Sequence, residues 1–379
     1  MLATFRFNEM MIRSGKKGLL AGALALSLLG GCQKASNKNE RPVAKKVEAM
    51  TLASTSHIGK ETLSAYGFFK GNLSDLQPAD RVYPYELNTP LFTDYAHKKR
   101  FIYVPEGKVI NYEDKEALDF PEGSVLIKNF YYPNDFNNPE LGKRIIETRL
   151  LIKEAKGWKA LPYIWNKEQT EATLQVAGGE TEVAWVHDNG ENMVTNYIVP
   201  NMNQCKSCHV FGQDIAPLGP KARQLNRNNV YAEGEFNQLA YLAEKGVLKG
   251  LPEAHAIPKV AVWNDASTGT LDARARAYLD INCGHCHNPS GPAKTSGLDL
   301  TVFASTAMER GINKPPVAAG KGAGNLNYDI VPGHPEHSIL LYRMESVDPG
   351  VMMPELGRGL VHKEGVSLIR EWIEKMPMQ

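Results

Sequence analysis

The pattern Cys-x-x-Cys-His occurs twice in this chain of 379 residues, and it constrains the fold more than any other feature. One copy runs from Cys205 to His209 and the other from Cys283 to His287. This spacing is the attachment pattern for c-type haem, because two thiols add to two vinyl groups at one porphyrin edge and the next histidine reaches the iron. The sequence therefore predicts two covalently attached haem c groups, held by Cys205, Cys208, Cys283 and Cys286, with proximal iron ligands His209 and His287.

Two other uses of paired cysteines fit the sequence less well. A tetrahedral zinc site can be built from two Cys-x-x-Cys pairs, but 74 residues separate Cys208 from Cys283 and both pairs end in histidine. A thioredoxin-like redox pair needs a strand that enters a helix, and neither motif follows such a pattern. With four cysteines on haem and Cys32 left for lipid, no disulfide is expected.

The first 31 residues read as an export signal. Basic residues precede the apolar run from Gly18 to Leu29, which is too short to span a bilayer comfortably. Leu29-Gly30-Gly31-Cys32 resembles a bacterial lipobox, which implies that Cys32 is acylated and becomes the mature N-terminus. The alternative is an ordinary signal peptide with an incidental cysteine. Residues 32–55 are polar and read as a flexible tether.

The predicted location follows from this N-terminus. A lipid on Cys32 would anchor the protein to a membrane, facing the periplasm. Gln33, rather than Asp, follows the cysteine, which resembles the outer-membrane sorting pattern of enterobacterial lipoproteins, so we expect the outer membrane rather than the inner. A balance of 43 basic against 42 acidic residues lacks the basic excess that nucleic-acid binding requires.

Residues 56–200 have the pattern of a β-rich domain. Short runs that alternate apolar and polar residues are separated by turns rich in Gly, Asn, Asp and Pro. This spacing predicts a β-sandwich or a barrel-like domain. The expected strands are Arg100–Val104, Ser124–Tyr132, Lys143–Lys153, Gly157–Trp165, Thr173–Val176 and Asn196–Val199.

The rest of the chain is expected to be mostly α-helical, which makes the whole a multidomain α+β protein. Residues 201–262 form the first haem c segment, where helices are expected within Asp214–Arg227 and over Glu233–Leu248. Residues 263–379 form a cytochrome c domain with the second haem. Its helices are expected at Leu271–Ile281 and Lys363–Met376, where Val366, Ile369, Trp372 and Ile373 form an apolar stripe.

Residues 270–376 resemble a class I cytochrome c, with a helix before Cys-x-x-Cys-His, a loop-rich middle, a Met-Pro loop and a terminal helix. The resemblance implies that the terminal helix packs on the first and that Met353, directly before Pro354, is the distal ligand of the second haem. Met352 is the alternative. Histidine and methionine together raise the reduction potential, which suits electron carriage.

The distal ligand of the first haem stays open. No methionine and only one histidine, His255, lie between His209 and Cys283. A compact domain with histidine and methionine ligands is therefore excluded for that segment alone. His255 and His187 are the leading candidates, beside another donor or an open iron. The other histidine pair, His334 and His337, falls at a turn that leads into a helix at about Ser338.

Over its length the chain resembles a family of largely uncharacterised bacterial dihaem c-type cytochrome lipoproteins. The resemblance implies single-electron transfer outside the cytoplasm with redox partner proteins that the sequence does not identify. An electron carrier is expected rather than a catalyst. Two alternatives remain, a dihaem peroxidase-like enzyme with an open first haem and a partner- or ligand-binding module in which the haems relay electrons.

Overall fold

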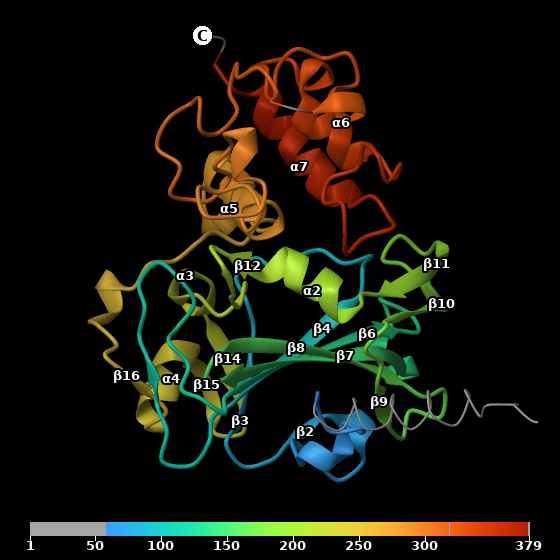
Figure 1. The fold of residues 1–379 in the computed structure, drawn as a ribbon, viewed down its shortest axis with the longest axis vertical. Coiled ribbons are helices and arrows are strands. Elements are labelled where there is room, and N and C mark those ends of the chain that lie inside the picture. The colour runs from blue at the N-terminus through green and yellow to red at the C-terminus, as the bar shows by residue number, and fades with distance from the viewer. Residues whose placement is uncertain (1–57, 318, 378–379) are drawn as a thin grey trace, which may run out of the picture. The chain divides into compact units, whose positions relative to one another are not determined.

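A computed structural model describes residues 58–317 and 319–377 of the chain. The expected signal peptide, the tether and Cys32 lie outside these residues, so their roles stay predictions. No helix within the described ranges is long and apolar enough to cross a membrane. The described part is mixed α+β, with an antiparallel sheet region followed by a more helical part (Figure 1).

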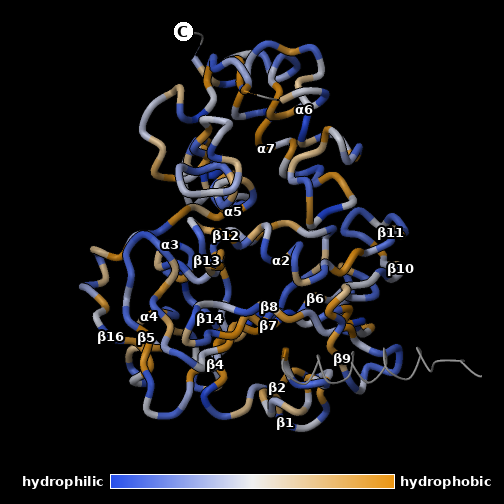
Figure 2. Tube along the Cα trace, in the orientation of Figure 1, coloured by the Kyte–Doolittle hydropathy of each residue, from blue (hydrophilic) through white to orange (hydrophobic). Residues whose placement is uncertain are grey.

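Six antiparallel strands form the main sheet, in the order β3-β4-β6-β7-β8-β9. Alternate side chains of a strand point to opposite faces, so each face of the sheet finds its own partners. Hydrophobic residues are frequent along the central strands (Figure 2). The strands are β3 (Val82–Tyr85), β4 (His97–Tyr103), β6 (Val125–Pro133), β7 (Lys143–Glu154), β8 (Gly157–Trp165) and β9 (Ala172–Leu174).

One face of the sheet is a continuous hydrophobic core. Phe101, Ile127 and Leu150 are fully buried there. They pack in one cluster with Leu63 and Phe68 from the segment that precedes the sheet, which includes η1 (Ser64–Tyr66), β1 (Phe69–Lys70) and β2 (Gln77–Pro78). Because side chains alternate along a strand, the neighbours of these buried residues in each strand face the other side of the sheet.

The other face carries two separate hydrophobic clusters. Ile102 and Leu126 belong to the first, together with residues of the first haem-motif segment. Phe130 and Tyr132 belong to the second, beneath the hairpin of β10 (Gly179–Val186) and β11 (Asn192–Val199). The strip of sheet between these clusters is polar, and it lies next to the first motif.

The β-sandwich or barrel expected for residues 56–200 is wrong in its layering. Among the described residues up to 200, the structure has one open six-stranded sheet, the two-stranded pairs β1-β2 and β10-β11, and the short strand β5 (Ile110–Asn111), in place of two comparable sheets or a closed barrel. Alternation along a strand shows that it has a buried face, but not how strands are divided among sheets. The expected strands at β6, β7 and β8 are confirmed to within one residue.

The first haem-motif segment shares its core with the sheet. It contains α2 (Met202–His209), α3 (Ala222–Leu225) and α4 (Gln238–Glu244), and α2 packs close to β8 (Figure 1). Leu239 and Leu242 of α4 join the cluster of Ile102 and Leu126. Short pairs β12 (Val210–Phe211) with β13 (Asp214–Ile215), β14 (Asn228–Tyr231) with β15 (Gly234–Asn237), and β5 (Ile110–Asn111) with β16 (Leu248–Lys249) complete it.

The helix expected over Glu233–Leu248 is shorter than predicted. Residues 234–237 form β15, and α4 starts only at Gln238. The reason is a helix cap: the Asn237 side chain accepts hydrogen bonds from the backbone N–H groups of Leu239 and Ala240. A capped start fixes the first turn and leaves the preceding residues free to pair as a strand.

The C-terminal part matches the predicted helices closely. It contains α5 (Leu271–Asn282), α6 (Ile339–Glu345) and α7 (Lys363–Glu374). Ile369 and Trp372 of α7 lie in one cluster with Tyr278 and Leu279 of α5. Trp372 Nε1 also donates a hydrogen bond of 2.9 Å to Asp272 Oδ1, so the expected packing of the terminal helix on the first is confirmed.

Two buried polar contacts tie these parts together. Arg223 of α3 and Asp280 of α5 form an ion pair with Nη2 and Oδ2 3.0 Å apart and both side chains 3% exposed. The Asp94 carboxylate, which precedes β4, accepts hydrogen bonds of 2.8 Å from the backbone N–H groups of Gly359 and Leu360. The first contact joins the two motif segments, and the second joins the Met353 loop to the sheet.

Candidate haem sites

The first Cys-x-x-Cys-His motif lies on a short, well-capped helix. Asn201 and Gln204 form a capping box at the start of α2, in which each side chain accepts a hydrogen bond from the other residue's backbone N–H. The helix buries Cys205, and Cys208 follows nearly one turn later on the same side. The cap therefore places both thiols before any cofactor is bound.

His209 ends α2 with one ring nitrogen already engaged. Its Nδ1 lies 2.9 Å from the carbonyl oxygen of Ala216. A carbonyl only accepts, so Nδ1 carries the proton and Nε2 keeps its lone pair. Burial also lowers the pKa of His209 to about 4, so the ring is neutral at pH 7. A neutral imidazole oriented through its other nitrogen is the usual state of a metal ligand.

The second motif begins at Cys283, the residue that caps the C-terminal end of α5. His287 Nδ1 lies 3.0 Å from the Ser296 hydroxyl, and that hydroxyl donates its own proton to the carbonyl of Ala293 at 2.8 Å. The hydroxyl must then accept from Nδ1–H, so His287 also keeps a free Nε2 lone pair. Its pKa is lowered to about 4 by burial. The two histidines thus reach the same protonation state through different partners.

The two motifs line adjoining cavities. Cys205 and His209 line a cavity of about 170 Å³, and Cys286 and His287 line a second of about 560 Å³. The cavities share part of their walls, including Cys208, Cys283, Met344 and Met353. Two cysteines with 74 residues between them in the sequence, Cys208 and Cys283, therefore line the same cavities in the fold.

Met353 lies at the junction of the two cavities. It is half-buried, whereas Met352, the alternative ligand, is buried and lines neither cavity. The backbone carbonyl of Met353 accepts a hydrogen bond of 2.9 Å from Arg358, whose guanidinium also donates to the carbonyls of Arg343 in α6 and of Ser346, which follows α6. Because Asp94 fixes Gly359, the loop that carries Met353 is anchored to the sheet. Met344, which sequence reasoning missed, lines both cavities beside it.

The two leading candidates for the distal ligand of the first haem lie elsewhere. His255 is exposed, and His187 packs against Tyr95 with ring centroids 4.6 Å apart. Neither lines the described cavities. The histidines that line the first cavity beside His209 are instead His285, inside the second motif, and His362. Sequence distance hid both, since they reach this cavity only through the packing of α5 and α7.

The cysteine chemistry does not favour the alternatives to haem. Burial raises the pKa of Cys283 and of Cys286 to about 12, whereas redox-active Cys-x-x-Cys thiols have lowered values. Within the described residues, no group of three or more candidate ligand atoms that lie within 4.8 Å of one another includes a cysteine. The geometry therefore does not support a zinc site made of the four thiols.

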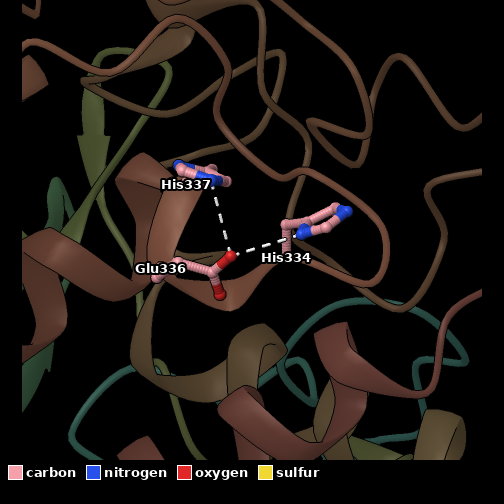
Figure 3. Close-up of side chains that lie close together, drawn as sticks. All are labelled: His334, Glu336 and His337. Carbon is pink, nitrogen blue, oxygen red and sulfur yellow. Dashed lines mark hydrogen bonds and ion pairs between the residues drawn. The ribbon is translucent and has the colours of Figure 1, made fainter.

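The group that does meet this distance criterion is His334, Glu336 and His337 (Figure 3). All three side chains are at least half exposed, and a Glu336 carboxylate oxygen lies 3.2 Å from His334 Nδ1 and 3.5 Å from His337 Nε2. The backbone is the expected turn, with η8 (Pro335–His337) leading through Ser338 into α6. The group lies outside the two cavities.

The residues present fit a haem at both sites in the chemistry of their donors. Each cavity has cysteine thiols and the histidine of its own motif, a neutral imidazole with a free Nε2. The second cavity has the size usual for cofactor pockets, about 300–1,000 Å³. The first is smaller and would have to widen around a porphyrin.

Polar side chains of the sheet also line the first cavity. Arg100, Lys128 and Arg149 reach it from β4, β6 and β7. Two other arginines are engaged outside this cavity, since Arg223 pairs with Asp280 and Arg276 donates to the carbonyls of Val302 and Ala304. Comparisons of the chain with models of protein families, with curated proteins and with solved structures found no match.

Proposed function

We propose that this chain is a dihaem c-type cytochrome that transfers single electrons outside the cytoplasm. The observation that carries the proposal is the meeting of the two Cys-x-x-Cys-His motifs in adjoining cavities, each with a histidine whose Nε2 is free. When bound, haem supplies the one-electron chemistry of its iron. The chain supplies attachment, ligation and partial exclusion of water.

In this proposal each part of the chain has a separate task. Residues 201–262 and 263–379 act as two haem c segments, the first built onto the sheet and the second resembling a class I cytochrome c. Met353 serves as the distal ligand of the second haem. Cys32 carries the lipid that holds the protein at the outer membrane, where it meets its redox partner proteins.

Adjoining cavities favour a relay between the haems over two independent sites. The shared wall contains one cysteine of each motif, Cys208 and Cys283. Haem groups held at these two motifs would therefore be next to each other, and one could pass an electron to the other. Because both sites are fixed in one folded chain, transfer between the haems would not depend on diffusion.

A redox titration of the mature protein tests this proposal. The protein is reduced stepwise while its absorbance and spin state are recorded. We expect two one-electron steps, one of them with the spectrum of histidine and methionine ligation. A single step, or no step, would contradict the dihaem carrier. Peroxide turnover by the half-reduced protein would favour the peroxidase-like alternative instead.

A further inference from the structure

Three cationic side chains stand side by side in one rung of the main sheet, which we call the cationic rung. Arg100 of β4 is opposite Lys128 of β6, and Lys128 is opposite Arg149 of β7. All three line the cavity of the first motif. Like charges directly opposite each other destabilise a sheet. A chain that keeps this arrangement needs negative charge nearby.

The carboxylates of the protein neutralise only part of the rung. Arg100 Nη1 lies 2.8 Å from Glu86 Oε2, and Arg149 Nε donates a hydrogen bond of 2.8 Å to Glu147. Within the described residues the Lys128 Nζ has no hydrogen bond or ion pair, and it lies 4.7 Å from the centre of the Phe130 ring. Lys128 is therefore the one member of the rung without a carboxylate partner.

A second unpaired ammonium lies on the same face. Lys98 is two residues before Arg100 in β4, and it too forms no ion pair in the part of the chain that the structure describes. Asp94 attracts it at longer range, but that carboxylate accepts hydrogen bonds from Gly359 and Leu360. Burial is the main cause that lowers the pKa of both Lys98 and Lys128, so this face holds two lysine amines that form no ion pair within the described residues.

The hydrophobic surroundings make a packing role for the rung implausible. Ile102 and Leu126 fill the next rung on one side, and Phe130 lies on the other. An apolar triplet at Arg100, Lys128 and Arg149 would join these two clusters into one core. The cations instead separate them at the place where the sheet meets the first motif.

We propose that the cationic rung binds the two propionate carboxylates of the haem attached at Cys205 and Cys208. This inference rests on the proposed function. Haem carries two propionates, which are anionic at neutral pH, and Arg100, Lys128 and Arg149 all line the cavity of the first motif while only the two arginines have a carboxylate partner. Arginine matches a carboxylate with two parallel N–H donors, and lysine adds a point charge. A free small carboxylate or phosphate has the same chemistry, so the test separates the two sources.

The test compares Lys128→Leu with Lys99→Leu in the dihaem protein. Lys99 lies in β4 on the opposite face, so its loss removes the same charge without touching the rung. In Lys128→Leu we expect the equilibrium constant for reduction of one haem to fall about tenfold, which lowers its reduction potential by about 59 mV. The propionate bending band in the resonance Raman spectrum should shift as well. Lys99→Leu should leave both readouts unchanged, and Lys128→Arg should restore them.

Several results would overturn the assignment. One such result is that Lys128→Leu and Lys99→Leu have the same reduction potentials and propionate bands. If Lys128→Leu does not mature with haem, Lys128→Gln replaces it in the comparison. Saturable binding of inorganic phosphate or succinate to the wild-type dihaem protein, lost in Lys128→Leu, would mean that the rung is open to free anions. If the wild-type protein carries no haem, the proposed function itself is wrong. If it carries two haems and Lys128→Leu leaves the propionate bands unshifted, only this inference is wrong.

Discussion

Breaking the buried ion pair between Arg223 and Asp280 should cost the protein about 3–5 kcal/mol of stability. Both side chains are 3% exposed, with Nη2 and Oδ2 3.0 Å apart. In Arg223→Met the almost fully buried Asp280 carboxylate would keep only the Val302 N–H, at 3.2 Å, as a hydrogen-bond partner. An exposed pair contributes about 1 kcal/mol or less, so burial decides the magnitude.

Urea unfolding of the dihaem protein measures this cost. The matched control is Lys321→Met, which breaks the pair with Asp348 between side chains 69% and 47% exposed. The double variant Arg223→Met/Asp280→Leu should recover much of the loss, because no charge is then left unpaired. A loss below about 1 kcal/mol in Arg223→Met, or no recovery in the double variant, would refute the reasoning.

Two further predictions concern the iron ligands of the second site. Met353→Ala should lower the potential of one haem and remove its methionine-to-iron absorption band, while Met344→Ala should leave that band in place; unaltered spectra in Met353→Ala would mean that another group is the distal ligand. Ser296→Ala should raise the potential of the same haem in a redox titration, because His287 loses the acceptor that makes its ring more basic. A shift confined to the other haem would contradict this pairing.

Local patterns predicted the elements of the fold well. The period of two located β6, β7 and β8, and the apolar stripe of Val366, Ile369 and Trp372 located α7 and its buried face. These signals depend on residues close together in the sequence. The layering of the sheet did not follow from them, because alternation does not say which strands share a sheet.

The difference between residues close in the sequence and residues brought together by folding also explains which parts of the sites could be predicted. The spacing of two thiols and a histidine is local, so both motifs could be found by inspection. The cationic rung could not, since Arg100, Lys128 and Arg149 become neighbours only through strand register. His362 likewise reaches the first cavity through the docking of α7, whereas His255, nearer in sequence, is exposed.

The mass and haem content of the mature chain test the central claim most directly. The protein is matured in a host that attaches c-type haem, purified, and analysed by intact mass and by its reduced absorption spectrum. The account predicts two haem groups per polypeptide that stay bound after denaturation. A colourless protein, or one whose mass is accounted for by its processed and acylated residues alone, would contradict it.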